Sequence, residues 1–314
     1  MKILVLGAGA IGGYFGGRLA AAGVDVTFLV REKRREQLER DGLRIESLVG
    51  DMALPVKTIA ASALRPVYDV ALLTCKAYDL DSAMDAIAPA MSTTSCVLPL
   101  LNGMAHYTHL DERFDRHRVL GGTCMINATL RADGLIQHSA RMQRLVFGER
   151  DRSATARTQA FANALQRTTL DWDLSQDINQ ELWEKVVMLA TLASVTSLFR
   201  ANVREIMASP GGQAAMERAL DANVAIATQE GRAPREAAVT FSHSNLTDPA
   251  GTWNASMLRD MEVGNQVEAD HIVGWMLERA REHRVDDAML GLAYTHLKAY
   301  EARRAAARLP TGPA

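Results

Sequence analysis

The sequence predicts an α/β fold in which a Rossmann-type, doubly wound parallel sheet is followed by an all-helical C-terminal domain. Two observations predict it. Short apolar runs alternate with helical patterns through the first third of the chain, and only helical patterns follow Asp177. We expect a first domain over residues 1–169, a helical domain over residues 170–308 and a flexible tail over residues 309–314.

The first domain is predicted from apolar runs of the buried, parallel type and from the helical segments between them. The expected strands are Lys2–Leu6, Asp25–Val30, Val70–Thr74, Ser95–Leu101, Val119–Asn127, Leu135–His138 and Arg144–Phe147. The expected helices are Ile11–Ala22, Arg34–Asp41, Leu80–Met91 and Ser153–Arg167. This βαβ order places helices on both faces of one parallel sheet.

The second domain is predicted from helix start and stop residues. Asp177 and Gln180 can cap a long helix that runs to about Phe199. Prolines start the next helices and a glycine ends one of them. The remaining expected helices are Pro210 to Gly231, one that starts at Pro234, Asn265–Glu282 and Asp286–Arg304.

Composition excludes several classes of protein. The 314 residues include 35 basic and 37 acidic side chains and are 48% hydrophobic, so neither a disordered chain nor a protein that binds polyanions is expected. We therefore expect no nucleic-acid partner. The three cysteines, Cys75, Cys96 and Cys124, have no metal-ligand spacing and indicate buried thiols in a reducing compartment, the cytoplasm.

The N-terminus superficially resembles a secretory signal, because an apolar stretch follows Lys2 and three alanines follow at 20–22. Glycines crowd this segment and Arg18 interrupts it, which an exported apolar region does not show. The best apolar run elsewhere, Val186 to Val195, is half of the roughly 20 residues that a spanning helix needs. We therefore expect no association with a membrane.

The sequence Gly7-Ala8-Gly9-Ala10-Ile11-Gly12 is a G-x-G-x-x-G motif between the first strand and the first helix. Gly7 allows a tight turn, Gly9 lets a pyrophosphate approach the backbone, and Gly12 lets the helix pack closely on the strand. The helix N-terminus offers N–H groups to the anion. The motif favours dinucleotide binding over a structural glycine turn.

The residue after the second strand discriminates between NAD and NADP. NAD enzymes carry an acidic residue there for the ribose 2′-hydroxyl, whereas this strand ends at Arg31. Arg31, with Arg34 and Arg35 nearby, suits a 2′-phosphate, so NADPH is the predicted cofactor. The alternative is a solvated charge run, because Glu32 and Glu36 balance these arginines.

Two polar residues follow other predicted parallel strands. Lys76 follows the strand Val70–Thr74, and Asn102 follows Ser95–Leu101. Ligands of open α/β sheets bind at the carboxyl ends of the strands, so both residues are candidates to line a site. The alternatives are a solvated lysine and a simple Asn-Gly turn.

Further motifs follow in order along the chain. They are Cys75-Lys76-Ala77, Asn102-Gly103-Met104, Trp183-Glu184-Lys185 and Ser256-Met257-Leu258-Arg259-Asp260 with Glu268 and Asp270. With the glycine motif and Arg31, this order resembles the ketopantoate reductases (2-dehydropantoate 2-reductases) from Lys2 to about Arg304. The resemblance implies NADPH-dependent reduction of 2-dehydropantoate to pantoate in the pantothenate and coenzyme A pathway.

The resemblance also implies roles for individual residues. Lys185 matches the catalytic lysine, which gives a proton to the oxygen as hydride reaches C2. Glu268 matches an acid that contacts cofactor or substrate hydroxyls and helps to orient the lysine. Ser256 matches a substrate contact, and Asn102 matches a residue that touches the nicotinamide ribose and the substrate. Without the resemblance, Lys185 is a surface lysine paired with Glu181.

The sequence departs from the family pattern one and two helical turns beyond Lys185, where Leu189 and Ala193 replace expected asparagines. Asn202 and Asn254 lie one residue from other expected asparagines. A drier pocket weakens the prediction of ketopantoate itself and leaves another 2-oxo acid, or a 3-hydroxy acid dehydrogenase, as alternatives. A protein that senses NADP(H) without turnover is a further alternative.

The histidines give no metal site. His106 and His109 are three residues apart, but no third ligand accompanies them at a suitable spacing, so we expect surface histidines and no bound metal. His271 follows Glu268 by three residues on the same predicted helix and lies in the site, in the core or at an interface. The apolar helical domain makes a homodimer reasonable.

Overall fold

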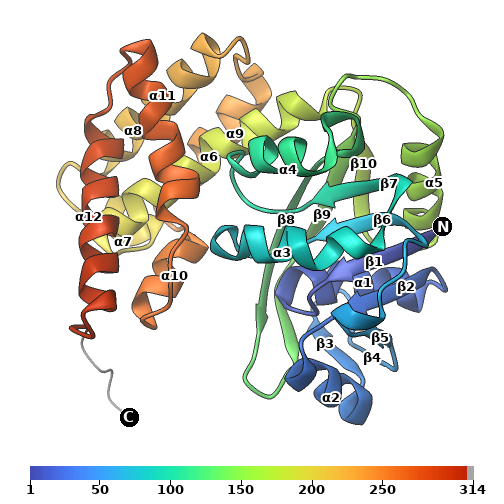
Figure 1. Cartoon of the computed structure of the whole chain (residues 1–314). Helices are drawn as coiled ribbons and strands as arrows, with labels where there is room; N and C mark the ends of the chain where they lie inside the picture. Colours follow the sequence, from blue (N-terminus) through green and yellow to red (C-terminus); the bar gives the residue numbers. More distant parts are fainter. Residues whose placement is uncertain (310–314) are drawn as a thin grey trace. The chain divides into compact units, whose positions relative to one another are not determined.

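The computed structural model describes residues 1–309, and residues 310–314 of the expected tail lie outside the described part. Contacts divide the chain into two compact units (Figure 1). The sheet unit contains Met1–Leu101 and His106–Glu181, and the helical unit contains Asn102–Ala105 and the chain from Leu182 onward. The four residues Asn102–Ala105 thus belong to the helical unit although they follow a strand of the sheet unit.

The first sheet of the sheet unit has the predicted parallel, doubly wound topology, with the strand order β5-β2-β1-β6-β7. Its strands are β1 (Lys2–Leu6), β2 (Asp25–Leu29), β5 (Lys57–Ile59), β6 (Tyr68–Leu73) and β7 (Met91–Pro99). In register, Ile3 of β1 lies opposite Val26 of β2 and Val70 of β6. The central strands β1, β2 and β6 are apolar and largely buried because helices cover the sheet, whereas the edge strand β5 is half-exposed.

A second sheet, with the order β10-β9-β3-β4 and with β8 paired to β9, was not predicted as a separate sheet. Its strands are β3 (Leu43–Ser47), β4 (Met52–Leu54), β8 (Gly121–Leu130), β9 (Ile136–Gly148) and β10 (Asp171–Leu174). The runs predicted at 135–138 and 144–147 are one continuous strand, β9. The sequence missed β3, β4, β5 and β10 because such short, half-exposed strands lack a long apolar run.

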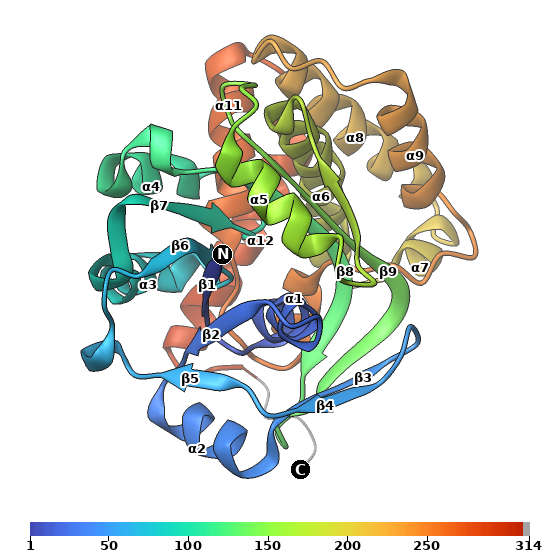
Figure 2. The same cartoon turned by 90° about the vertical axis from the view of Figure 1, so that its right-hand side faces the viewer.

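Helix α1 (Ala10–Ala21) lies between the two sheets (Figure 2). Its glycines allow this, because a side chain at each would strike a sheet. A Cβ at Gly16 would lie 2.8 Å from the Phe28 ring of the first sheet, and a Cβ at Gly17 would lie 2.7 Å from Leu43 Cδ2 of the second. Gly12 and Gly16, four residues apart, thus face the first sheet, and Gly13 and Gly17 face the second.

The other helices of the sheet unit are α2 (Glu32–Asp41), α3 (Leu80–Ile87), α4 (His106–Phe114) and α5 (Ala156–Leu165). Helix α3 ends at Ile87, earlier than predicted, because a 3₁₀ turn with Pro89 leads directly into β7. Helix α4 was not predicted. The sequence boundary near Thr169 is also corrected, because β10 pairs in parallel with β9 and keeps residues 171–174 in the sheet unit.

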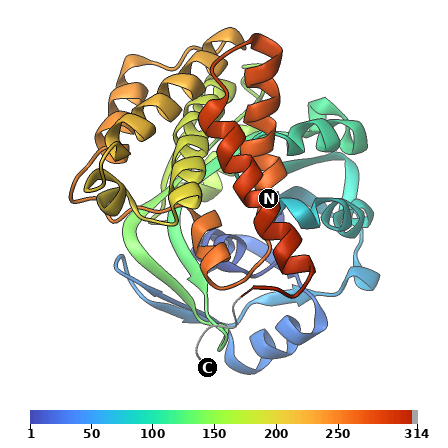
Figure 3. The ribbon, with the colours of Figure 1, turned by 90° about the vertical axis from the view of Figure 1, so that its left-hand side faces the viewer.

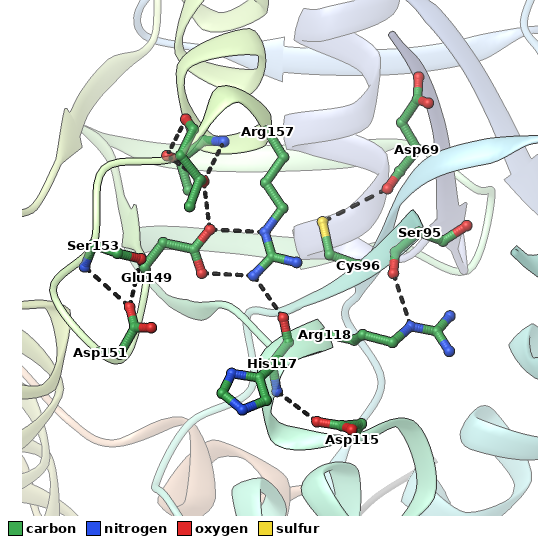
Figure 4. A network of polar contacts seen from close by, with 12 residues as sticks. Asp69, Ser95, Cys96, Asp115, His117, Arg118, Glu149, Asp151, Ser153 and Arg157 are labelled. Carbon is green, nitrogen blue, oxygen red and sulfur yellow. Dashed lines mark hydrogen bonds and ion pairs between the residues drawn. The ribbon is translucent and has the colours of Figure 1, made fainter. Parts of the chain in front are cut away.

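A buried ion pair holds the start of α5. Glu149 is 5% exposed and accepts hydrogen bonds from Arg157 Nε at 2.7 Å and Nη2 at 2.6 Å. Figure 4 shows Arg157 also reaching the carbonyl oxygen of His117, at 2.7 Å. In the same region burial raises the pKa of the Cys96 thiol to about 12, so this cysteine is an inert core residue. Cys124 is buried as well, whereas Cys75 is only half-buried.

The helical unit takes helix α6 from Leu182 onward and consists of helices (Figure 3). Their apolar side chains form one core. The helices are α6 (Ile178–Phe199), α7 (Val203–Met207), α8 (Gly212–Gln229), α9 (Glu236–Leu246), α10 (Ser256–Glu262), the π-helical turn η5 (Asp270–Gly274), α11 (Trp275–His283) and α12 (Ala288–Ala305). The predicted helix Asn265–Glu282 begins only at Ala269. Leu309, which the sequence assigns to the tail, packs against this core.

Helix α6 is long and apolar enough to cross a membrane by length and composition, unlike the shorter run judged from sequence. This is weak evidence, because 67% of its most apolar 18-residue window is buried inside the protein. Core helices of globular proteins meet the same criterion.

Candidate functional site

The glycine motif forms the turn between β1 and α1 that the sequence predicts. Gly7 adopts a φ of +86°, which side-chain-bearing residues rarely adopt, and its N–H donates to Leu29 O of β2 at 2.9 Å. Gly9 is the N-cap residue of α1, and a Cβ there would meet no atom within 4 Å. The backbone around Gly9 is therefore open to a ligand.

Gly12 has a different role from Gly9. A Cβ at Gly12 would overlap the carbonyl oxygen of Gly7 and the hydroxyl of Thr74. That hydroxyl donates to Leu6 O at 2.9 Å and so links β6 to the end of β1. Gly12 thus lets α1 approach the loop, and the first N–H groups of α1 lie where an anion would bind.

The three arginines after β2 differ in their partners. Arg31 is exposed, and its guanidinium makes no hydrogen bond or ion pair within residues 1–309. Arg34 is half-buried and donates from Nε to Ala8 O of the glycine motif at 3.1 Å. Arg35 pairs with Glu32 at 2.5 Å and with Glu39 at 3.4 Å. Arg31 is therefore available to a ligand and Arg35 is not.

Lys76 stands beyond the end of β6, as predicted, and is half-buried at the N-cap of a 3₁₀ turn, Ala77–Asp79. It lies on the carboxyl edge of the first sheet, the edge that also carries the glycine motif. Its role as a cofactor contact stays a prediction.

In the helical unit, Lys185 and Asn102 are brought together although 83 residues separate them. Lys185 Nζ donates to Asn102 Oδ1 at 3.2 Å. Both side chains are half-buried, and Lys185 lies in the second turn of α6. The contact aims the ammonium group of Lys185 and leaves Asn102 Nδ2 as a donor.

Glu268 is 7% exposed and lies just before the π-helical turn η5 rather than inside a helix as predicted. Two features require a glycine at position 103. Its φ is +79°, and a Cβ there would lie only 2.9 Å from His271 O of η5. The Asn102-Gly103 loop therefore lies against the turn that follows Glu268. Turns of the π type are frequent at functional sites.

The aromatic pair Trp183 and Trp275 packs α6 against α11, with ring centroids 5.3 Å apart. The Arg279 guanidinium lies 3.5 Å from the centroid of the Trp275 ring. Glu184, next to Lys185, is held by Arg235, whose Nε lies 2.8 Å from Oε1. Sequence reasoning missed the Trp183–Trp275 and Glu184–Arg235 contacts, because no local pattern links residues that are 50 to 100 positions apart.

Ser256, the other predicted substrate contact, is the first residue of α10 and is half-buried. Its hydroxyl makes no hydrogen bond within the described part of the chain. Its neighbour Ala255 donates from N to Thr196 Oγ1 of α6 at 3.4 Å. The structure therefore joins α10 to α6 three turns beyond Lys185.

The two apolar replacements on α6 have different surroundings. Ala193 is 1% exposed and belongs to the core of the helical unit, whereas Leu189 is only half-buried. Leu189 lies one helical turn after Lys185 and shares its face. Leu189 packs against the same core, and Met188 and Leu192 are further apolar residues on this side of α6.

The histidines differ in part from the prediction. His106 is fully buried beside Tyr107, whereas His109 is exposed. A group that sequence reasoning did not single out, Glu230, Glu282 and His283, could offer ligand atoms to a metal among the described residues. Its His283 Nε2 already lies 2.9 Å from Glu230 Oε1, and Glu282 is exposed.

The chain matches two family models. The model described as ketopantoate reductase PanE/ApbA covers residues 3–152, and its C-terminal counterpart covers residues 177–301. This chain belongs to the ketopantoate reductase family. Members of this family are oxidoreductases that bind NAD(P)H.

Individual relatives extend over the whole chain. The Bacillus subtilis protein named uncharacterized oxidoreductase YkpB is 35% identical over 97% of this chain and 100% of its own length. The 2-dehydropantoate 2-reductase of Nostoc is 26% identical over 98% of each chain. The sequence resemblance to the family is therefore confirmed.

Solved structures confirm the fold. A PanE/ApbA family ketopantoate reductase from Ralstonia eutropha superposes with a TM-score of 0.87 at 22% identity, over 97% of this chain and 100% of its own. A D-mandelate dehydrogenase with NADH and anilino(oxo)acetate superposes with a TM-score of 0.86 at 20% identity, over 97% and 100%. The two-part fold is thus shared by proteins named for different substrates.

The sheet unit fits a dinucleotide. Gly9 leaves open space above the N-terminus of α1, Gly7 and Gly12 let the backbone close around that space, and Arg31 has a guanidinium without a partner within residues 1–309. Backbone N–H groups bind a pyrophosphate, and an arginine binds a 2′-phosphate with paired hydrogen bonds. The residues present therefore fit an NAD(P)H dinucleotide.

Proposed function

We propose that the protein reduces a 2-oxo acid with NADPH, and that 2-dehydropantoate, which becomes pantoate, is the substrate. In this proposal residues of the sheet unit bind the cofactor and residues of the helical unit act on the substrate. The observation that carries it is the hydrogen bond between Lys185 Nζ and Asn102 Oδ1. This contact orients an ammonium group, and cofactor binding alone would not need such a group.

The proposed reaction needs a hydride and a proton. NADPH, when bound, supplies the hydride to C2. Lys185 then stabilises the negative charge that develops on the carbonyl oxygen and gives that oxygen a proton from Nζ. Asn102 orients the ammonium group, and Glu268 accepts hydrogen bonds from hydroxyl groups or from the lysine.

Each predicted contact has a role in this proposal. The backbone from Gly7 to Gly12 holds the pyrophosphate, Arg31 the 2′-phosphate, and Lys76 a further part of the cofactor. Ser256 offers its hydroxyl to the substrate. We also propose that the enzyme works as a homodimer in the cytoplasm. Light scattering measures the dimer, and a ketopantoate reductase from Staphylococcus aureus is described as dimeric.

A second candidate substrate is a 2-oxo acid with an apolar side chain. Leu189 favours it, because a half-buried leucine one turn from Lys185 cannot bond to a substrate hydroxyl. A substrate hydroxyl that is buried against this leucine without a hydrogen-bond partner costs about 1–3 kcal/mol of binding free energy, whereas an apolar substrate group incurs no such cost.

The experiment is a set of initial rates of NADPH oxidation with 2-dehydropantoate and with 2-oxo acids of increasing apolar side chains. The proposal predicts the highest kcat/KM with 2-dehydropantoate. A preference for the apolar acids selects the second candidate. NADPH binding without turnover of any 2-oxo acid would contradict both and indicate an NADP(H) sensor.

A further inference from the structure

The segment that carries Glu268 is held from one side by helix α12. Before Glu268, Tyr300 Oη donates to Asn265 O at 2.7 Å, and Arg304 Nε donates to Gly264 O at 2.9 Å. After Glu268, the π-helical turn η5 contacts the same helix. The backbone on both sides of the candidate acid therefore depends on α12.

Tyr294 of α12 binds both ends of the π-helical turn. Its hydroxyl donates to Asp270 Oδ1 at 2.6 Å, and Asp270 is the first residue of η5. Its ring lies against Gly274, the last residue, where a Cβ would be 2.8 Å from Cε2. One side chain thus spans the turn, and only glycine leaves room for the ring.

Lys298, one turn after Tyr294, adds a charged contact. Its Nζ donates to both oxygens of Asp270, at 3.1 and 3.0 Å, and also pairs with Glu301 at 2.5 Å. Burial raises the pKa of Asp270, but the hydrogen bonds from Tyr294 and Lys298 outweigh it and hold the pKa below the usual 3.8. Asp270 is therefore a carboxylate at neutral pH and accepts from both side chains.

The π-helical turn holds the backbone of Glu268, because Ile272 N of η5 donates to Glu268 O at 3.2 Å. A π-helical turn contains one more residue than an α-helical turn, and one residue corresponds to about 100° of rotation around a helix. Because isolated π turns are less stable than α turns, side-chain contacts must maintain η5. On its other side, His271 of η5 lies against Gly103, next to the Asn102 that binds Lys185.

We propose that Asp270, Tyr294 and Lys298 are positioning residues that maintain the π-helical turn and so fix Glu268. This inference rests on the proposed function for its kinetic consequence. None of the three residues is proposed to touch substrate or cofactor. Their effect on turnover passes through Glu268.

The kinetic test compares Asp270→Asn with Asp85→Asn, which breaks an exposed ion pair to Arg113 in the sheet unit. Asp270→Asn keeps an oxygen for Tyr294 but places an amide near Lys298. We expect kcat to fall on the order of tenfold, part of the ~100-fold that a 1 Å displacement of a reacting group can cost. The KM of Asp270→Asn for NADPH should stay at the wild-type value. The kcat of Asp85→Asn should also stay at the wild-type value.

A double-mutant cycle separates positioning from a general loss of stability. In a Glu268→Gln background, Asp270→Asn should change kcat by less than about twofold, because residues that act through one another are not additive. Tyr294→Phe, which retains the ring on Gly274, should show the same coupling with a smaller effect. A full tenfold loss in the Glu268→Gln background would overturn the proposal.

Amide hydrogen exchange tests the turn without any turnover. Asp270→Asn should accelerate exchange in residues 268–274, and Asp85→Asn should not. Unchanged exchange together with unchanged kcat would overturn the positioning role while leaving the proposed function intact. Accelerated exchange in a protein that reduces no 2-oxo acid would support the turn's anchoring and contradict only the proposed function.

Discussion

The sheet unit and the helical unit prepare their functional groups by different means. In the sheet unit the backbone forms the candidate site, and glycines at 7, 9 and 12 keep side chains away from it. In the helical unit side chains form it, and other side chains from distant segments hold them, as Asn102 holds Lys185. The first unit is therefore sensitive to added atoms, and the second to lost hydrogen bonds.

The largest effect is expected from an added methyl group in the glycine turn. Gly12→Ala places a Cβ against Gly7 O and Thr74, so we expect destabilisation of about 1–3 kcal/mol and loss of NADPH binding. Gly9→Ala is the matched variant, since its Cβ meets no protein atom. It should keep the wild-type Tm and lose NADPH affinity. Thermal unfolding measures the Tm of each variant, and titration measures its NADPH affinity. An equal loss of Tm in Gly12→Ala and Gly9→Ala would contradict the different roles of the two glycines.

A second large effect is expected from Lys185→Ala in the helical unit. The variant loses the ammonium group but adds no atom, so the fold and the Kd for NADPH should be unchanged. We expect kcat to fall by ~100-fold or more, the usual contribution of general acid catalysis. Steady-state rates with saturating NADPH measure it. Wild-type turnover would remove Lys185 from the mechanism.

A smaller effect is expected from Arg31→Ala. Removal of a charge-assisted hydrogen bond costs about 1.5–3 kcal/mol, or roughly 10- to 100-fold in the Kd for NADPH, while the Kd for NADH stays near its wild-type value. Arg35→Ala is the control, because Arg35 already pairs with Glu32 and Glu39. Fluorescence titrations with both cofactors measure the difference. Equal losses for NADPH and NADH would refute the 2′-phosphate contact.

The smallest effect concerns pH and the stability of the helical unit. Because the pKa of Asp270 is lower in the folded protein, its ion pair stabilises the fold above pH 3.8 and loses this contribution as the pH falls through the folded pKa. Urea unfolding of the wild type and Asp270→Asn should therefore differ at pH 7 and converge as the pH falls from 3.8 through the folded pKa. A difference that grows in acid would contradict the assignment.

How much the sequence predicts also differs between the two units. The glycine turn lies within six consecutive residues, so local spacing predicts its position and that of α1. The second sheet was missed because β3, β4 and β10 are short and half-exposed, and their pairing with β9 is not local.

In the helical unit the residues that meet are far apart. Only the family resemblance named Lys185 and Glu268 before the structure, whereas Asn102 was also a candidate from its place after a predicted strand. The π-helical turn was predicted as ordinary helix, because its contacts with Tyr294 and Lys298 come from a helix more than 20 residues later. No helical periodicity in residues 265–282 reveals those contacts. Side-chain sites supported by distant segments therefore require the structure.

The most direct test of proton donation by Lys185 is the single-turnover rate of NADPH oxidation in Lys185→Arg beside Lys185→Ala. Arginine keeps the positive charge but does not release a proton near neutral pH. With NADPH affinity unchanged in both variants, we predict that Lys185→Arg is nearly as slow as Lys185→Ala. A Lys185→Arg rate close to that of the wild type would contradict proton transfer from this residue.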